Sequence, residues 1–358
     1  MKINTSFKPS TLLAALCLIG IGIRTASADI GYQFVPVGNP GNANDTTGYG
    51  GVNYSYQMGK YDVTLTQYTL FLNAVAAADP YSLYNSSMGT DLNIAGIARS
   101  GTSGSYSYSV IGDGQRPVTY VGWLDAARFS NWLNNGQPTG IGEVAGSTEQ
   151  GAYTLNGDII ITGSQGLETK NANAQYWIPS ENEWYKAAYY DPNLSGTGGY
   201  WLYPTRSNTA PGNVVGSGIN QANYNNGVYS VTQSSINSSS QNYLTDVGAF
   251  TNSASAYGTF DQGGNVWQWN DAVIFDSTRG IRGGSWDSRA NGATVLQSSA
   301  RSNDGPSHES SNIGFRIATV VPEPSTWAML VAGTASLVAL RRRNKRSVST
   351  VATTTSAN

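Results

Sequence analysis

The sequence predicts a single α+β domain with much irregular chain. Three segments show the apolar spacing of amphipathic helices, the apolar runs typical of strands are short, and long stretches rich in Gly, Ser and Asn separate them. With 39% hydrophobic and 12% charged residues, the chain can bury a packed core. No repeat or internal linker divides the body of the chain, so we expect one domain over residues 29–319.

Two of the expected helices begin with a capping box. Thr64 is followed three residues later by Gln67, and Ser180 by Glu183. In this motif a hydroxyl and a longer polar side chain bond the free N–H groups at the start of a helix. The apolar spacing continues after each box, and it also predicts a helix over residues 124–133.

Short apolar and β-branched runs predict the strands. They occupy residues 32–37, 106–111, 153–155, 158–162 and 314–321. The long polar segments between these elements predict loops. The loops cover residues 38–56, 85–105, 193–243 and 287–312. Loops of this length in a compact domain either argue against the assignment or mark functional segments.

The start of the chain has the pattern of a secretory signal peptide over residues 1–28. Two lysines precede an apolar core at residues 12–23, and a small-x-small triplet ends at Ala28. We expect cleavage before Asp29; the alternative is a short buried helix. The only cysteine, Cys17, lies inside this segment, so the mature chain is expected to have none.

The other end combines a Pro-Glu-Pro triplet with an apolar run and a basic cluster. Pro322, Glu323 and Pro324 precede the uncharged residues 325–340, and three arginines follow. Sixteen residues is just under the roughly 17–25 that cross a bilayer as a helix, and the basic cluster would hold that end in the cytoplasm. The run therefore predicts a transmembrane segment before any processing.

This end resembles the PEP-CTERM sorting signal of Gram-negative bacteria over residues 320–346. The resemblance implies processing by an exosortase, a membrane transpeptidase-like enzyme, after export across the inner membrane. Such signals accompany exopolysaccharide systems, so the cell surface, outer envelope or extracellular matrix is the expected location. A simple membrane anchor is the alternative. Residues 347–358 are expected to form a disordered basic and polar tail.

The two ends hold the basic excess of the chain. In total there are 20 basic and 22 acidic residues, but the body, residues 29–319, contains 12 basic and 21 acidic residues, for a net charge of −9. An acidic surface repels phosphate backbones, so we expect no nucleic-acid partner.

Six blocks of the body occur in the order of a known family. They are residues 59–73 (beginning GKYDVT), 116–133, 177–188 (WIPSENEWYKAA), 263–269 (GGNVWQW), 282–286 (RGGSW) and 314–316 (GFR). On these blocks the chain resembles the formylglycine-generating enzyme group, also called the sulfatase-modifying factor domain, over roughly residues 32–318. The resemblance implies an irregular, loop-rich variant of the C-type lectin fold.

The chemistry of the family's oxidase members is not expected here. The resemblance implies copper held by two cysteines, which lie two and seven positions after the aromatic residue of the GGSW block. Ser288 and Ala293 stand at these positions, and neither supplies a thiolate. A second branch uses iron held by three histidines, and this chain has only His308. We therefore assign no catalytic residue and expect no copper, iron or zinc.

Calcium is the metal that the residues allow, because it takes oxygen ligands from carboxylates, amides and carbonyls. The family's calcium loop corresponds to Asp261, Gly264, Val266 and Gln268, with a neutral glutamine where the family has Glu. A second, weaker site begins at Asn223-Tyr224. The alternative for both is an ordinary buried turn.

Two functions remain open. The first is a non-oxidase binding or structural module of the cell envelope or exopolysaccharide matrix, because sugar rings pack on aromatic faces and the body is rich in aromatic residues. The second is an enzyme of undetermined chemistry in the same family cleft. A pocket with convergent polar groups favours the enzyme, and a filled cleft favours the module.

Overall fold

The computed structural model describes residues 30–159, 169–275, 277–288 and 292–321. Several expected features lie outside this part of the chain. They are the signal peptide with its cleavage point between Ala28 and Asp29, the triplet Pro322, Glu323 and Pro324, the apolar segment 325–340 and the tail 347–358. Within the described part, no helix is both long and apolar enough to cross a membrane.

The three expected helices are present. They are α1 (Leu65–Val75), α3 (Trp123–Asn134) and α4 (Glu181–Tyr189). Both capping boxes form: the Thr64 hydroxyl accepts the N–H of Gln67 at 3.3 Å, and the Ser180 hydroxyl accepts the N–H of Glu183 at 3.2 Å. Shorter helical segments complete the set. They are α2 (Ser87–Thr90), η1 (Ala145–Glu149), η2 (Leu194–Gly196) and η3 (Gly292–Leu296).

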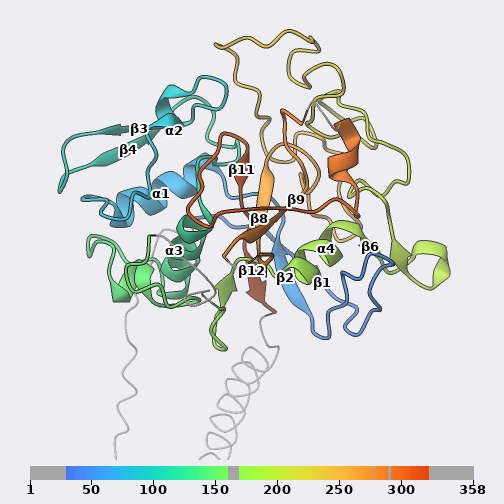
Figure 1. The fold of residues 1–358 in the computed structure, drawn as a ribbon, viewed down its shortest axis with the longest axis horizontal. Coiled ribbons are helices and arrows are strands. Elements are labelled where there is room, and N and C mark those ends of the chain that lie inside the picture. The colour runs from blue at the N-terminus through green and yellow to red at the C-terminus, as the bar shows by residue number, and fades with distance from the viewer. Residues whose placement is uncertain (1–29, 160–168, 276, 289–291, 322–358) are drawn as a thin grey trace, which may run out of the picture.

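Two four-stranded sheets form the centre of the domain (Figure 1). The first has the order β1 (Phe34–Val37), β2 (Tyr56–Gly59), β12 (Ala318–Val320), β5 (Tyr176–Trp177). The second has the order β10 (Ser302–Asp304), β9 (Arg279–Arg282), β8 (Trp267–Val273), β11 (Ile313–Gly314). Two hairpins are separate from them. They are β3 (Ile97–Ser100) with β4 (Ser107–Val110) and β6 (Tyr190–Asp191) with β7 (Gly199–Tyr200).

One chain segment joins the two sheets. β11 pairs in parallel with β8 in the second sheet, and β12 pairs antiparallel with β2 and β5 in the first. Phe315 and Arg316 lie between these two strands, so both side chains are held where the sheets meet. In Figure 1, β8 and β9 lie near the middle, with α1 and α3 on one side and α4 on the other.

Several expected elements differ from the structure. The single strand expected over residues 314–321 is split between two sheets: β11 ends at Gly314, β12 begins at Ala318, and Arg316 is buried in the irregular connection between them. Residues 153–155 form no strand, because the N–H of Tyr153 bonds the side chain of Asn131 instead of a neighbouring strand. The expected loop over residues 85–105 contains α2 and β3, and that over 287–312 contains η3 and β10. Of the expected strand 158–162, residues 160–162 lie outside the described part, and 158–159 are irregular.

The largest hydrophobic cluster packs α1 and α3 against the first sheet. The ring of Phe129 lies 5.2 Å from that of Phe71 and 5.4 Å from that of Phe315, measured between centroids. Phe315 reaches this cluster from the β11–β12 connection, and Arg316, the next residue, extends from the same connection into the polar centre of the domain. The fold is thus a single α+β domain, as the sequence predicts.

Candidate functional site

The polar centre of the domain is organised by Arg316, whose side chain is fully buried. The guanidinium donates to the side-chain oxygens of Gln268 at 2.7 Å and Asp62 at 2.9 Å. It also donates to the carbonyl oxygens of Gly59 and Phe260. One cation therefore ties together the first sheet, the second sheet and the loop before β8.

Burial changes the proton affinity of this centre. It raises the pKa of Asp62 to about 8 and that of Asp261 to about 6, while the nearby charge of Arg316 lowers both. Burial lowers the pKa of Arg316 itself. Two carboxyl groups thus share one guanidinium, and the raised pKa of Asp62 means that Asp62 keeps its proton at neutral pH.

Gln268 and Asp261, two of the residues expected to bind calcium, bond other protein groups. The Oε1 atom of Gln268 accepts N–H groups from Arg316 and Trp184, each at 2.7 Å, and its Nε2 atom donates to the carbonyl oxygen of Asp261 at 2.7 Å. The carboxylate of Asp261 accepts the N–H of Gly248 at 2.6 Å. A neutral amide suits this place because it both accepts from the arginine and donates to a carbonyl.

The two expected calcium loops are bonded to each other. The N–H of Asn265 donates to the carbonyl oxygen of Asn223 at 2.7 Å, and the Nδ2 atom of Asn223 donates to the side-chain oxygen of Asn265 at 3.0 Å. Gly264 has a φ of +83°, and a Cβ there would lie 2.3 Å from the carbonyl oxygen of Asn223, so only glycine fits this turn. Val266 is fully buried, and the hydroxyl of Tyr224 donates to a backbone carbonyl.

These contacts test whether the residues suit calcium. The side-chain oxygen of Gln268 already accepts two N–H groups and lies against a guanidinium, so Gln268 does not fit the role of a ligand. Within the described residues, no cluster of three His, Cys, Asp or Glu side chains could hold a metal ion. Calcium binding through Asp261, Gly264 and Val266, or at Asn223, stays a prediction.

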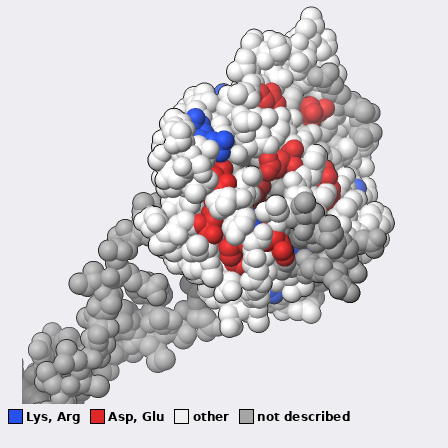
Figure 2. Space-filling model, turned by 60° about the vertical axis from the view of Figure 1, so that its left-hand side comes forward, with Lys and Arg blue, Asp and Glu red and all other residues white. Residues whose placement is uncertain are grey.

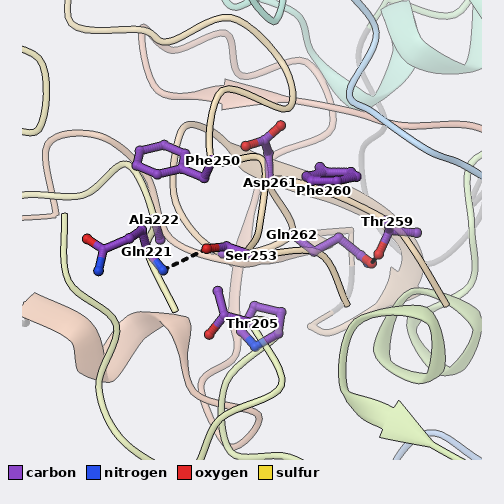
Figure 3. Close-up of a pocket in the computed structure, with 11 residues that line it drawn as sticks. Thr205, Gln221, Ala222, Phe250, Ser253, Thr259, Phe260, Asp261 and Gln262 are labelled. Carbon is purple, nitrogen blue, oxygen red and sulfur yellow. Dashed lines mark hydrogen bonds between the residues drawn. The ribbon is translucent and has the colours of Figure 1, made fainter. Parts of the chain in front are cut away.

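A small cavity of about 10 Å³ lies beside Asp261 (Figure 3). Its lining includes Thr205, Gln221, Ser253 and Gln262. In this view the carboxylate of Asp261 points away from Ser253 and Gln262. It accepts the N–H of Gly248. A cavity of this volume holds at most one water molecule, so it offers no ligand site.

The family's cysteine positions lie in different surroundings. The N–H of Ser285 donates to the hydroxyl of Ser288 at 3.0 Å, and the Ser285 hydroxyl lies 2.8 Å from a carboxylate oxygen of Asp287. Asn312 donates to the same oxygen of Asp287 at 3.1 Å. Ala293 instead packs in η3 against an apolar cluster. The sequence places no thiolate at either position, and Ser288 serves to hold a turn.

The aromatic residue of the GGSW block is packed rather than free. The ring of Trp286 stacks on that of Tyr243 with an interplanar angle of 2° and a centroid distance of 5.2 Å, and Tyr229 lies 4.3 Å beyond Tyr243. All three side chains are buried. Protein rings therefore occupy the space next to Trp286 where a bound molecule would otherwise stack.

A second group of aromatic rings lies around α4. We define the tyrosine row as Tyr49, Tyr185, Tyr200, Tyr190 and Tyr257, whose successive rings contact one another at centroid distances from 5.0 to 6.5 Å. Tyr185 is buried, whereas the other four rings are partly exposed. The row thus presents aromatic surface to solvent.

Charged residues fix one end of the tyrosine row. Glu181 is buried and accepts from both Arg282 and Arg301, at 2.8 and 2.7 Å. Both guanidinium groups also lie about 5 Å from the ring of Tyr49, at 4.9 and 5.2 Å. The sequence indicates Glu181 only as a helix-start residue; its partners lie 101 and 120 residues away, and no local signal reveals them.

An open groove of about 310 Å³ adjoins this end of the row. Its lining includes Tyr49, Asn182, Glu181 and Asp271. Burial raises the pKa of Asp271 to about 7, although the guanidinium of Arg279 lowers it. Acidic side chains also outnumber basic ones on the face of the molecule shown in Figure 2, in agreement with the acidic body that the sequence predicts.

The fold and the site define a single-domain α+β protein with a buried arginine centre, in which the loops around Asn223 and Asn265 bond each other. The sulfatase-modifying factor enzyme 1-like domain family matches residues 50–321, and the PEP-CTERM protein-sorting motif matches residues 320–343. The chain therefore belongs to the sulfatase-modifying factor enzyme 1-like domain family. The two resemblances seen in the sequence, to this family and to the PEP-CTERM sorting signal, are both confirmed. The sorting motif indicates export, exosortase processing and sorting to the surface or exterior of a bacterium.

Several solved structures are similar to this chain. CarF is 20% identical, with 82% of this chain and 100% of CarF covered and a TM-score of 0.46. Treponema denticola variable protein 1 is 17% identical, with coverages of 81% and 95% and a TM-score of 0.43. PvdO from Pseudomonas aeruginosa is 16% identical, with coverages of 81% and 92% and a TM-score of 0.38. No curated protein matches the chain.

Proposed function

We propose that this protein is an exported, surface-sorted binding module of the cell envelope or exopolysaccharide matrix of a Gram-negative bacterium, without the oxidase chemistry of its family. Ser288 and Ala293 supply no thiolate for copper, and the mature chain is expected to hold no cysteine. The rings packed on Trp286 also fill the neighbouring space. These features argue against formylglycine-type oxidation and leave binding as the better-supported role.

The observation that carries the proposal is the tyrosine row with its adjoining groove. Sugar rings present C–H faces that pack on aromatic rings, while their hydroxyls bond amides and carboxylates. Tyr49 supplies a ring at the groove, and Asn182, Glu181 and Asp271 supply polar groups within the same 310 Å³. This combination suits a chain of sugar units lying along the row.

The test is binding of the exported protein to the polysaccharide matrix of the producing organism. Tyr190 is partly exposed and contacts both Tyr200 and Tyr257, so Tyr190→Ala should lower the affinity about tenfold. Tyr106→Ala is the matched control, because Tyr106 is also partly exposed but packs on Arg99, away from the row. Absence of binding by the unaltered protein, or equal losses in the two variants, would count against the proposal.

The alternative is an enzyme that uses the family cleft with other chemistry. The observation in its favour is the pair of hydroxyls on Ser285 and Ser288, 3.2 Å apart, beside the carboxylate of Asp287. The histidine of the chain, His308, is 54% exposed and bonds Asp304 rather than either serine. Ser288 is the partly exposed member of the pair, whereas Ser285 is buried. Covalent labelling by a fluorophosphonate that is lost in Ser288→Ala would favour this alternative over the binding module.

A further inference from the structure

One long stretch of the chain carries no charged side chain. Residues 207–245 contain no Asp, Glu, Lys, Arg or His, whereas the body as a whole holds 21 acidic and 12 basic residues. Asn, Ser, Gln and Gly make up most of the stretch. In Figure 1 its yellow part forms the upper edge of the molecule. A neutral region thus belongs to an otherwise acidic body.

Aliphatic side chains on this stretch are exposed to solvent. Ile219 is 78% exposed, Ile236 is 76% exposed and Val214 is 58% exposed, and Val215 and Val231 are exposed as well. Single exposed apolar residues are normal on a protein surface, but several on one region indicate a surface that contacts another molecule. The stretch therefore combines neutral polar groups with apolar side chains that the protein itself does not cover.

These five residues lie on two adjoining turns. Residues 212–221 form the first turn, whose two ends pair with each other, and residues 229–236 form the second. The Nε2 atom of Gln233 in the second turn donates to the carbonyl oxygen of Asn213 in the first, at 3.1 Å. We define the uncharged face as the exposed side chains of these two turns.

The framework beneath the uncharged face is held by hydrogen bonds. Asn213 is buried, and its Nδ2 atom donates to the carbonyl oxygens of Tyr224 and Val228 at 3.1 and 2.8 Å. The side-chain oxygen of Gln221 accepts the N–H of Val214 at 2.9 Å. A surface that is ordered before binding loses little conformational entropy when a partner docks on it.

The absence of charge selects the occupant of this face. Two copies of an acidic protein repel each other where their charged surfaces meet, and a contact through neutral turns avoids that repulsion. Side chains of Asn, Gln and Ser both donate and accept hydrogen bonds, so a surface rich in them is complementary to a copy of itself. A symmetric dimer needs such self-complementarity. A basic partner would bind the acidic surfaces instead.

We propose that this protein associates with a second copy of itself through the uncharged face. The contact is symmetric: it covers Val214, Ile219 and Ile236 of each protomer, and the surrounding amides and hydroxyls bond across it. The acidic surfaces of both protomers stay in solvent. Because the face is small, we expect a dimer Kd on the order of 1–100 μM.

Sedimentation velocity of the exported protein over a series of concentrations tests this association. The fraction of dimer should rise with concentration. Raising the NaCl concentration should not weaken the dimer, because salt screens charged contacts and this contact has none. Tyr190→Ala, which alters the tyrosine row, should associate as the unaltered protein does.

A double variant tests the two turns. Val214→Asp with Ile236→Asp places one carboxylate on each turn, and a symmetric contact would bring these like charges together. The dimer Kd should rise at least about tenfold at an unchanged Tm, because both side chains are exposed. If the double variant has a lowered Tm, the two single variants decide, each with a rise of about threefold or more.

The matched control is Phe275→Asp. Phe275 is 69% exposed and lies in the connection between β8 and β9, outside the two turns, so this variant should associate as the unaltered protein does. Equal weakening in the control and the double variant would overturn the proposal, as would full association in the double variant.

Two further results would overturn it: a monomer at every concentration, or a dimer that salt dissociates. A monomeric protein that binds a neutral polysaccharide, and loses this binding in the double variant, would assign the face to sugar and overturn the dimer. Matrix binding that is lost in Tyr190→Ala and kept in the double variant belongs to the tyrosine row. Failure of the matrix-binding proposal and failure of self-association are therefore separate results.

Discussion

The guanidinium of Arg316 contacts two polar regions that differ in how well their atoms are hydrogen-bonded: its Nε atom bonds Gln268, and its Nη2 atom bonds Asp62. At the Gln268 end, the arginine, Trp184 and the carbonyl of Asp261 use both polar atoms of the amide. At the Asp62 end, one carboxylate oxygen is bonded and the other is buried without a donor in the described chain, beside a cavity of about 240 Å³. At the Gln268 end the protein satisfies every polar atom of the amide, whereas at the Asp62 end it leaves a buried oxygen unpaired within the described chain.

The difference indicates how the two ends contribute to stability. A polar group that the protein satisfies by itself contributes to specifying the fold, and one left without a partner costs stability and has its pKa shifted by burial. Resemblance to the family directs attention to the Gln268 end, but the unsatisfied atoms lie at the other end. Four changes test this contrast, and their expected effects decrease from the first to the last.

Removal of the shared cation should affect both ends at once. Arg316→Met leaves Asp62 and Asp261 without their buried counter-charge and leaves Gln268 and two carbonyls without a donor. We expect a loss of about 3–5 kcal/mol in the free energy of unfolding, measured with urea.

The control for this change is Arg116→Met. Arg116 is 28% exposed and lies 3.9 Å from Asp246, so its loss should cost less than about 1 kcal/mol. If Arg316→Met were as mild as its control, the arginine centre would not be the joint between the two sheets.

The Asp62 end should make stability depend on pH. Burial raises the pKa of Asp62 to about 8, above its value in the unfolded chain, so between about pH 4 and pH 8 the folded protein keeps a proton that the unfolded chain has released. The free energy of unfolding should therefore fall as the pH rises through this window.

Asp62→Asn isolates this contribution. Because other buried acids also titrate in the window, the variant should keep part of the pH dependence but lose a share of up to about 4 kcal/mol between pH 5 and pH 8, at about 1.4 kcal/mol per pH unit. Urea unfolding at intervals from pH 5 to pH 8 measures both proteins. Identical slopes would show that folding does not raise the pKa of Asp62.

Placing at position 268 the glutamate that the family resemblance implies should destabilise the Gln268 end and create a calcium ligand there. Gln268→Glu adds a third carboxylate to a centre with one arginine, and it removes the N–H that bonds the carbonyl of Asp261. We expect a loss of about 1 kcal/mol without calcium and a rise of Tm on adding calcium. The unaltered protein should show no such rise; a calcium-dependent Tm in it would mean that Asp261 and the neighbouring carbonyls suffice as ligands.

The sequence predicts the helices of this molecule better than its polar centre. Thr64 and Ser180 each bond a residue three positions away, so a local motif reveals them. Arg316 and Asp62 are 254 residues apart, and their segments are brought together by the pairing of β12 with β2 and by the bond from the N–H of Val63 to the carbonyl oxygen of Phe315. The sequence predicts one strand over residues 314–321 and therefore misses the break between β11 and β12 in which Arg316 lies.

The family positions show the same limit. The spacing of the GGSW block predicts that Ser288 and Ala293 stand at the family's cysteine positions, and neither residue can supply a thiolate. Whether Gln268 could still bind a metal depends on its partners, and Trp184 and Arg316 lie 84 and 48 residues away along the chain. Residue types therefore tell which chemistry is missing, and the long-range contacts tell what has replaced it.

The smallest expected effect gives the sharpest contrast, because it compares two tyrosines that pack on the same ring. Tyr32 and Tyr68 both lie 6.1 Å from Phe129, but the Tyr68 hydroxyl donates to the carbonyl of Leu83 at 2.8 Å, and that of Tyr32 has no partner in the described chain. Tyr68→Phe should lower the free energy of unfolding by about 1 kcal/mol or more, because it strands a buried carbonyl. Tyr32→Phe removes the same atom and should change it by less than about 0.5 kcal/mol. Equal losses in urea unfolding would mean that the Tyr32 hydroxyl already has a partner.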